Sequence, residues 1–405
     1  MARPVFLLGA GASIDAGLSD TNKLTRDIYK LLAAEKEALP AQVFGYVIAK
    51  ILTRKVRQGG SPFDEVNVEE AYDGLERLIF RGRDITSEFV SSWDPFLESL
   101  RSPFDTESFV AHLGRTVGLS QRSLSHGLGV QMDWHHLRAA AQEIANATGS
   151  SATWEQANIQ GRLIQALLTC LEHDSAKSGY MTEFMNLANR TNAILASLNY
   201  DLLIEDVLTK GHQTYDYGLS TWNEKKLVSF ANSRADFKLL KLHGSMNWYA
   251  SNEDTIIVDP ERPGRATPMM VFGGASGKLR PDGPFLQLRH EFERQLLNTN
   301  VFVVVGYAFG DGHLNAIIRR WVSTRRKAKM IVVNPAAIKF STEIIGFPYK
   351  LSKEHKLETK TVDLTHITKK TAAAIADLAG ELDRSIDLSI PKNASSYQGS
   401  LRIIE

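Results

Sequence analysis

Four short runs of apolar residues stand out along the chain, and a glycine or polar turn follows each of them. They are Val5–Leu8, Ala193–Leu198, Val301–Val305 and Met330–Val333. Runs rich in valine, isoleucine and leucine are typical of parallel strands buried on both faces. A fifth run, Phe237–Leu242, is mixed because Lys238 and Lys241 interrupt it. We therefore expect four buried parallel strands and a fifth of mixed character.

Helical patterns follow several of these strands, for example at Leu202–Lys210 and Gly312–Thr324. A repeated order of strand, turn and helix is typical of folds in which helices cover both faces of a parallel sheet. The pattern therefore predicts the α/β class, with a Rossmann-like doubly wound parallel sheet.

A long stretch between the first and second strands carries no strand signal. Its apolar residues recur at spacings of three and four, as they do in amphipathic helices. The clearest segments are Ile48–Arg57, Val68–Ile79, Trp134–Asn146 and Gln160–Asp174. We predict that residues 41–189 form a large all-helical insertion, and that the α/β core comprises residues 1–40 and 190–340.

The later segments are less regular. Residues Asn252–Gly283 are rich in Gly, Pro and Asp, which predicts a loop with a hairpin that would suit a lid. Beyond residue 340 we expect short strands, a helix near Thr371–Asp383 and a tail, Ile390–Glu405. We interpret residues 341–405 as a short C-terminal extension used for oligomerisation or docking.

Charge and hydropathy narrow the class of protein. The 405 residues include 47 basic and 46 acidic side chains, so no global charge attracts nucleic acid or a membrane surface. The basic run between Arg319 and Lys329 is expected to be a solvated helix face or an oligomer interface, with nucleic-acid contact as the alternative. No signal peptide or membrane-spanning stretch is visible, so the sequence predicts a cytoplasmic protein without membrane contact.

The sequence offers little for metal binding. Cys170 is the one cysteine, which excludes an internal disulfide and any zinc site built on two or four cysteines. His135 and His136 are adjacent, and adjacent helical residues point in different directions, so surface or core packing is favoured over a metal site. We predict no metal.

A glycine-rich turn directly follows the first strand, in the segment FLLGAGAS at Phe6–Ser13. Gly9 and Gly11 lack a Cβ, so the backbone there can approach a phosphate closely. A helix that opened after Ser13 would also aim its free N–H groups at a pyrophosphate. A third glycine would fall at Ile14 and is missing, so a plain α/β turn is the alternative.

Two polar motifs follow other predicted strands. In SLNYD, Asn199 offers a donor and an acceptor, and Asp201 is placed to cap the next helix; a simple Asx turn is the alternative. In KLHGS, Gly244 leaves the imidazole of His243 uncrowded. A histidine suits general acid or base catalysis near neutral pH, although a structural or surface role is the alternative.

A fourth motif is VVVGYAFGDGHLN, in which Gly306 ends a strand and Gly310 relaxes the turn. Asp311 is placed to cap the helix that begins near His313, and fixing this turn is an alternative to any ligand role. After the next strand, Asn334 lies where an adenosine ribose could be held.

In this order the motifs resemble the NAD-binding core of the sirtuins. The forms LNYDLLIE, KLHGSMNW and VGYAFGDGHLN are most similar to the sirtuin-like domains of bacterial antiphage defence proteins. The resemblance covers roughly residues 1–30 and 190–340. It implies a phosphate loop, residues beside nicotinamide and its ribose, a catalytic histidine and segments for the adenosine half. The phosphate loop would comprise Gly9, Ala10, Gly11, Ala12 and Ser13. Asn199 and Asp201 would lie beside nicotinamide and its ribose, and His243 would be the catalytic histidine. Gly306 and Asn334 would belong to the segments that bind the adenosine half.

The chain also departs from the sirtuin pattern. Gly17–Asp20 contains no proline, and the Phe-Arg pair that covers nicotinamide is missing. Deacylase sirtuins carry four zinc-binding cysteines after the His-Gly motif, whereas Ser245–Asn300 contains none. The resemblance therefore implies cleavage of the nicotinamide–ribose bond without zinc and without deacylation.

We accordingly expect NAD⁺ to be a substrate, hydrolysed to nicotinamide and ADP-ribose. Asn199 would orient water or the ribose hydroxyls, and His243 would act as base or ribose-binding group. Asp201 would hold the Asn199 loop or the ribose. A regulatory subunit that binds NAD or ADP-ribose, and an ADP-ribosyltransferase, remain as alternatives.

The resemblance further implies NAD depletion in antiphage defence by abortive infection. A toxic activity of this kind needs regulation, and the helical insertion would suit assembly or a gate. We expect a homo-oligomer, with a HerA-type hexameric ATPase as a possible partner through which any nucleic acid would be contacted.

Overall fold

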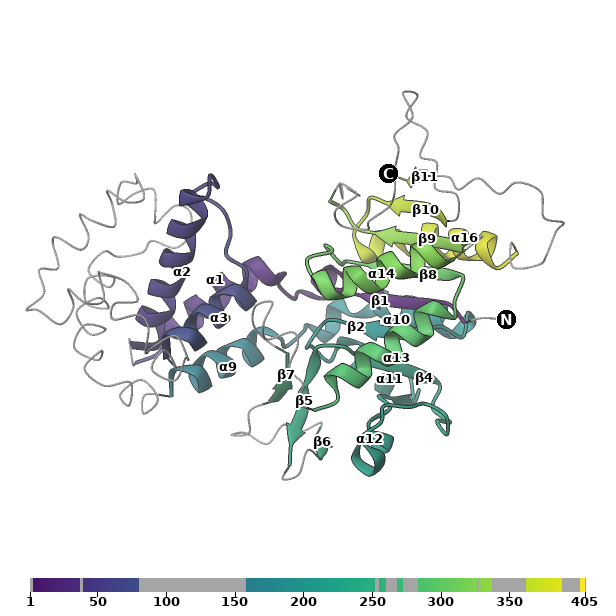
Figure 1. Cartoon of the computed structure of the whole chain (residues 1–405), viewed down its shortest axis with the longest axis horizontal. Helices are drawn as coiled ribbons and strands as arrows, with labels where there is room; N and C mark the ends of the chain where they lie inside the picture. The colour runs from purple at the N-terminus through teal and green to yellow at the C-terminus, as the bar shows by residue number, and fades with distance from the viewer. Residues whose placement is uncertain are drawn as a thin grey trace, which may run out of the picture. The chain divides into compact units, whose positions relative to one another are not determined.

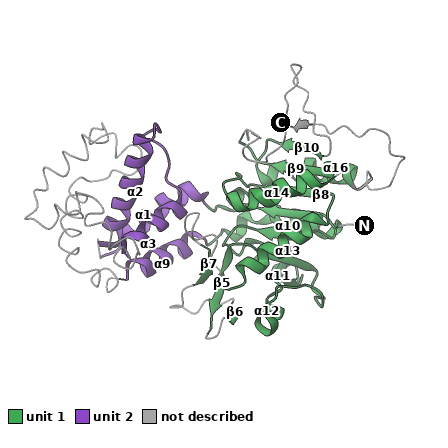
Figure 2. Ribbon diagram, viewed as in Figure 1, with its two compact units in different colours: residues 1–18, 172–271, 279–405 green, residues 19–171, 272–278 purple. Residues whose placement is uncertain are grey.

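A computed structural model describes residues 3–36, 39–79, 158–251, 255–259, 268–271, 283–325, 328–336, 362–387 and 401–404. The chain divides into two compact units (Figures 1 and 2). Unit 1 comprises residues 1–18, 172–271 and 279–405, and unit 2 comprises residues 19–171 and 272–278.

Unit 1 is built on an eight-stranded parallel sheet, which confirms the predicted fold class. Its strands are β1 (Val5–Leu8), β2 (Ile194–Ser197), β3 (Tyr215–Asp216), β4 (Phe237–Lys241), β8 (Val301–Val305), β9 (Ala328–Val333), β10 (Val362–Ile367) and β11 (Leu401–Ile404). They lie in the order β11-β10-β9-β8-β1-β2-β4-β3. All five predicted strands are among them.

The helices of unit 1 form two layers around this sheet (Figure 1). The first layer contains α10 (Gly179–Arg190), α11 (Leu203–Lys210) and α16 (Thr371–Asp387), and the second contains α13 (Phe285–Leu297) and α14 (Gly312–Thr324). The chain steps from β1 to β2 in one direction and from β8 to β9 in the other. Right-handed crossovers then place α10 and α14 on opposite faces. The strand order thus reverses between β1 and β8, where open α/β sheets bind ligands.

Buried aromatic side chains pack between the sheet and these layers. Phe6 of β1 lies 5.6 Å from Phe184 of α10, measured between ring centroids. On the other face, Phe302 of β8 lies 5.5 Å from Trp321 of α14, whose indole N–H donates to the Thr299 carbonyl. Burying one such side chain contributes about 1.5–3 kcal/mol, so these contacts fix the helices on the sheet.

A second, antiparallel sheet in unit 1 has the order β6-β5-β7. It consists of β5 (Gly244–Ala250), β6 (Ile256–Val258) and β7 (Pro268–Met270). β6 and β7 fall in the segment for which the sequence predicts a loop with a hairpin. A short helix, α12 (Leu219–Lys225), completes the described helices of this unit.

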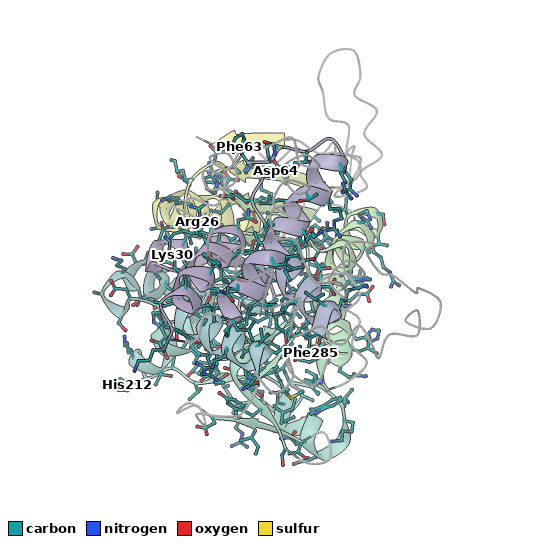
Figure 3. All side chains as sticks on the ribbon, turned by 90° about the vertical axis from the view of Figure 1, so that its left-hand side faces the viewer. Arg26, Lys30, Phe63, Asp64, His212 and Phe285 are labelled. Carbon is teal, nitrogen blue, oxygen red and sulfur yellow. The ribbon has the colours of Figure 1, made fainter. Side chains whose placement is uncertain are left out.

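Unit 2 is helical in its described part, as predicted. It contains α1 (Thr21–Ala33), α2 (Leu39–Arg57), α3 (Val68–Ile79) and α9 (Ile159–Cys170). The Asp20 side chain accepts hydrogen bonds from the backbone of Asn22 and Lys23 and so caps α1. Arg26 and Lys30, labelled in Figure 3, belong to the polar side of α1, whereas its residues Leu24, Ile28 and Leu32 are buried. The predicted helix Trp134–Asn146, with His135 and His136, lies outside the described residues.

The unit boundaries differ from the predicted domain boundaries, 41–189 for the helical part and 341–405 for the extension. Helix α1 belongs to the helical unit, whereas α10 packs on the α/β sheet through Phe184. β10, α16 and β11 are part of unit 1, because β10 pairs with β9 along its whole length. Helical periodicity marks each of these helices but does not say which unit buries its apolar face. Within the described residues, no helix is both long and apolar enough to span a membrane.

Candidate active site

A helix opens after Ser13, as the sequence predicts, but it is a short 3₁₀ turn and not an α-helix. Two such turns follow β1, Ala10–Ala12 and Ile14–Ala16, and Gly17 then adopts a left-handed conformation with φ of 90°. Helix α1 begins only at Thr21. The helix N-terminus that follows the loop is therefore that of a single 3₁₀ turn.

Most N–H groups of the loop already donate to backbone carbonyls. Gly9 donates to Val305, Gly11 to Gly306, and Ser13 to Ala10, over 2.9, 2.8 and 3.1 Å. Ala12 donates to Gly9. Among residues 9–13, all of which the structure describes, only the Ala10 N–H donates no backbone hydrogen bond. The bonds to Val305 and Gly306 thus fix the loop to the carboxyl end of β8.

The glycines are required because the loops after β1 and β8 touch. A Cβ on Gly9 would lie 2.8 Å from the Gly306 oxygen, and one on Gly306 would lie 2.1 Å from the Ala12 nitrogen. Gly306 also has φ of 64°, a conformation that side chains disfavour. From the sequence we expect Gly9 and Gly11 to be glycines because a phosphate approaches the backbone there. In the structure, both positions need glycine because the loops after β1 and β8 pack closely where the strand order reverses.

Asn199 clamps this loop from the end of β2. Its Nδ2 donates to the Gly9 oxygen and to Ser13 Oγ, both at 3.0 Å. Its own backbone N–H donates to Ser197 Oγ. Within the described part of the chain no hydrogen bond is assigned to its Oδ1, so the amide oxygen is the atom left for a ligand.

Asp201 uses both carboxylate oxygens within the protein. Oδ2 accepts from Ser13 Oγ at 3.0 Å, and Oδ1 accepts from the Leu203 N–H at the start of α11. The second bond closes an Asx turn just before α11, whose N-cap is Leu202, so the structure shows the alternative to the predicted helix cap. These bonds place Asp201 as a support for the loop.

A buried ion pair lies beneath Asp201. Lys241 Nζ donates to the Asp201 carbonyl at 2.5 Å and lies 3.1 Å from Glu205 Oε1, which also accepts from Tyr217. Burial raises the pKa of Glu205, and the neighbouring Lys241 opposes this shift. In the sequence Lys241 only interrupts an apolar strand; its role becomes visible once Asp201 and Glu205 lie beside it.

His243 follows β4 and pairs with Asp311. The distance from His243 Nε2 to Asp311 Oδ2 is 3.2 Å, and the two residues are 4% and 3% exposed. In the neutral tautomer that donates its Nε2–H to this carboxylate, Nδ1 holds the lone pair and can accept. Gly244 is needed beside His243 because a Cβ there would lie 2.1 Å from the Met269 oxygen.

Asp311 has a second function, as the sequence predicts. Its Oδ1 accepts from the N–H groups of His313 and Leu314 and caps α14. Its own N–H donates to the Tyr307 hydroxyl at 2.9 Å. The left-handed residue of this turn is Phe309, with φ of 57°, whereas Gly310 has no such requirement. The residues around Asp311 predict only the capping role, because its partner His243 lies 68 positions away in the chain.

Asn334 follows β9 and closes a turn. Its Nδ2 donates to the Tyr307 oxygen at 3.3 Å, and its Oδ1 accepts from the Ala336 N–H at 2.9 Å. Both polar atoms of this side chain thus have partners in the protein.

The structure therefore brings all predicted site residues to one edge of the sheet. Loop 9–13 bonds to Asn199, Asp201 and Gly306, and His243 bonds to the turn after Gly306 through Asp311. A histidine with an accepting nitrogen and an amide oxygen beside a rigid backbone loop can orient a polar substrate and accept a proton. No group of three or more potential metal-binding side chains occurs among the described residues.

One protein-family model matches part of the chain. The family model for a SIR2-like domain matches residues 193–345, which include Asn199, His243, Asp311 and Asn334 but not the loop at residues 9–13. This match assigns a SIR2-like domain to that segment, which is less than half of the chain. A comparison with curated proteins gives no match.

Solved structures of Sir2 proteins also align with this chain. A Sir2 homologue mutant bound to 2′-O-acetyl ADP-ribose is 11% identical, covers 96% of this chain and 94% of its own, and has a TM-score of 0.36. A Sir2 homologue–NAD complex is 12% identical over 94% and 90%, with a TM-score of 0.35. A third, from work on the mechanism and regulation of Sir2 enzymes, is 15% identical over 51% and 68%, with a TM-score of 0.29. These scores carry no weight for function, and the fold rests on the strand order itself.

Proposed function

We propose that this chain hydrolyses NAD⁺ at the bond between nicotinamide and ribose, with NAD⁺ as a substrate and no zinc. The main support for this proposal is the buried His243–Asp311 pair, which lies at the same edge of the sheet as Asn199 and the glycine loop. The SIR2-like match over residues 193–345 supports NAD as the ligand class.

In the proposed reaction the bond between C1′ and the nicotinamide nitrogen breaks, and its electron pair leaves with nicotinamide. A water oxygen forms the new bond to C1′ and releases a proton. His243 Nδ1 accepts that proton while Asp311 stabilises the resulting imidazolium. Asn199 orients the water or a ribose hydroxyl through its amide oxygen, and Asp201 keeps the loop in place.

The test is the release of nicotinamide from NAD⁺ by the purified chain and by the variants Asn199→Ala and His243→Ala. We expect both variants to keep the fold, checked by circular dichroism, and to lose activity by about 10²-fold or more. His290→Ala is the matched control, since His290 is exposed on α13. Full activity in both site variants would rule the proposal out.

The same assay separates the two alternatives. A regulatory protein that binds NAD or ADP-ribose would bind without releasing nicotinamide. An ADP-ribosyltransferase would release nicotinamide and leave labelled ADP-ribose on a macromolecule. Hydrolysis predicts free ADP-ribose in equal amount to nicotinamide.

We further propose that this activity serves antiphage defence by depleting NAD, in a cytoplasmic homo-oligomer that acts with a HerA-type hexameric ATPase. The resemblance of the motifs to defence proteins supports this proposal. Co-purification of the chain with the product of a neighbouring ATPase gene, and NAD⁺ turnover with and without it, provide the test. Full activity of the chain alone, together with no complex, would refute the partner.

A further inference from the structure

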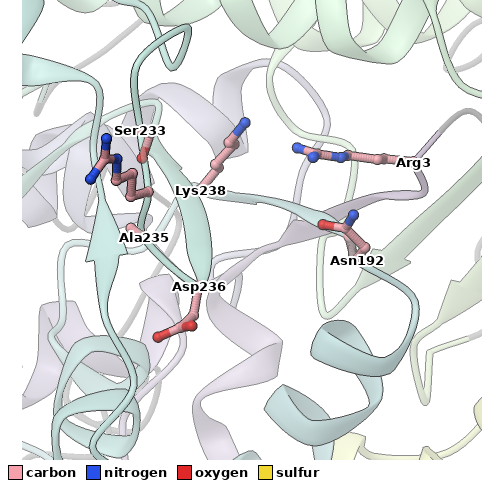
Figure 4. A pocket seen from close by; sticks show the side chains of 8 residues that line it. Arg3, Asn192, Ser233, Ala235, Asp236 and Lys238 are labelled. Atoms are coloured by element: carbon pink, nitrogen blue, oxygen red, sulfur yellow. The ribbon is translucent and has the colours of Figure 1, made fainter.

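A polar pocket of about 130 Å³ lies at the opposite edge of the parallel sheet from the candidate active site (Figure 4). Its walls come from the segments that lead into three adjacent strands. Arg3 precedes β1, Asn192 precedes β2, and Asp236 precedes β4. Strands β1 and β2 have four residues each, so about 13 Å of sheet separates this edge from the active-site edge.

Three cationic side chains line the pocket. They are Arg3, Arg234 and Lys238. In Figure 4 the side chains of Arg3 and Lys238 extend toward each other, while Asp236 points away from them. Over the described ranges, none of the three has an ion-pair partner.

The nearby carboxylates have other partners. Asp236 accepts from the backbone and the hydroxyl of Thr214, both at 2.8 Å. Glu291 accepts from Arg294 and Gln295, each at 2.7 Å. Asp216, beside Lys238 on β3, accepts from the Gly218 N–H at 2.7 Å. The like charges of the pocket are thus not neutralised by a direct contact with these acids.

Two further observations favour an anion as the ligand of this pocket. The pKa of Lys238 is lowered, first by partial burial and second by the neighbouring Arg3. The hydroxyl of Ser233 is buried and has no hydrogen-bond partner among the described residues. Buried hydroxyls are normally partnered, so this group is a donor available to a ligand in the pocket.

We propose that this pocket binds phosphate, either as the free ion or as the phosphate group of a small monoester. Arg3 and Lys238 supply charge-assisted hydrogen bonds from opposite sides, Arg234 adds charge, and Ser233 donates its hydroxyl. The small volume and the position of the pocket at the strand starts favour a small oxyanion over a nucleic-acid strand. The site is separate from the proposed NAD⁺ site.

The test is calorimetric titration of the full chain with inorganic phosphate and, separately, with glycerol phosphate at constant ionic strength. Arg3→Gln and Lys238→Gln should each raise Kd at least tenfold, and Ser233→Ala should raise it a few-fold. Lys210→Gln is the matched control because Lys210 is exposed on α11, and its Kd should match the wild type. A preference for one of the two probes distinguishes the free ion from a monoester.

Thermal unfolding without phosphate provides a second readout. Lys238→Gln should unfold at or above the wild-type temperature, because it removes repulsion from Arg3. Added phosphate should raise the unfolding temperature of the wild type but not that of the variant. No saturable phosphate binding, equal binding by all variants, or an equal effect of chloride would overturn the proposal. Binding of an oligonucleotide, but not phosphate, that depends on Arg3 and Lys238 would overturn it as well.

Discussion

Asp311 is a residue whose two carboxylate oxygens serve different parts of the molecule. Oδ1 caps α14, and Oδ2 pairs with His243. An asparagine at this position keeps an oxygen for the cap but replaces the carboxylate that would stabilise a protonated histidine.

We expect Asp311→Asn to fold normally and to lower kcat for NAD⁺ hydrolysis by about 10²-fold with little change in KM. Steady-state kinetics beside a thermal melt measures both effects. Asp311→Ala also removes the cap and should cost about 1 kcal/mol of folding free energy in addition. If Asp311→Asn retained wild-type kcat, the pair would have only a structural role.

Gly306 and Gly310 allow a second comparison at the residue scale. Gly306→Ala places a Cβ 2.1 Å from the Ala12 nitrogen in a left-handed conformation, whereas nothing lies within 4 Å of a Cβ on Gly310. We expect Gly306→Ala to lower the free energy of unfolding by about 2–4 kcal/mol and to abolish NAD⁺ binding. Gly310→Ala should change neither by a measurable amount. Denaturant titration and calorimetry measure the two quantities, and equal effects of the two substitutions would contradict the packing argument.

At the scale of elements, the Lys241–Glu205 pair joins β4 to α11 beneath the active-site loop. Both side chains are at most 3% exposed. Lys241→Met leaves Glu205 without its counter-charge, which should lower the free energy of unfolding by about 3–5 kcal/mol at neutral pH. Urea titration measures this loss.

The stability that Lys241→Met loses depends on pH, because Glu205 can take up a proton. Burial already raises the pKa of Glu205, and removing Lys241 raises it further. A carboxyl whose pKa is higher in the folded than in the unfolded state contributes its full stability at a pH below the unfolded-state pKa, about 4.3 for Glu. This contribution is lost as the pH rises through the folded-state pKa. Lys241→Met should therefore lose stability relative to the wild type as pH increases above about 4.3. Adding Glu205→Gln should remove the extra pH dependence; parallel profiles for the single and double variants would refute this explanation.

Element prediction succeeds where local pattern and burial agree. The runs at Val5–Leu8 and Val301–Val305 are apolar throughout and form β1 and β8 as expected. The strand at Tyr215–Asp216 is too short and polar to be recognised from its residues. Its place in the sheet is decided by pairing with Phe237–Lys241.

At the scale of the whole molecule, the chain leaves unit 1 after Leu18 and returns to it at Glu172. The two ends meet within unit 1, because the Asp174 N–H donates to the Ala16 oxygen at 3.1 Å. Replacing residues 19–171 with a short Gly/Ser linker should therefore leave a folded α/β unit with a single cooperative thermal transition. Circular dichroism and calorimetry measure this outcome.

A deletion of residues 41–189 is the matched comparison, because it also removes α10. Phe184 of α10 packs against Phe6, so this shorter chain should fail to fold. Folding of the second deletion, or failure of the first, would show that the unit boundaries are not those of independent folding.

The sequence by itself determined the class of the fold, five strands of the sheet and the residues at their carboxyl ends. These features follow from local pattern, because parallel strands place their ends at one edge. Tertiary structure decided which atoms meet there: His243 with Asp311, Lys241 with Glu205, and the glycines with each other. Such contacts join residues far apart in the chain, and no local pattern encodes the distance between them. Only the folded sheet shows that Asp311 faces His243 while it caps its own helix.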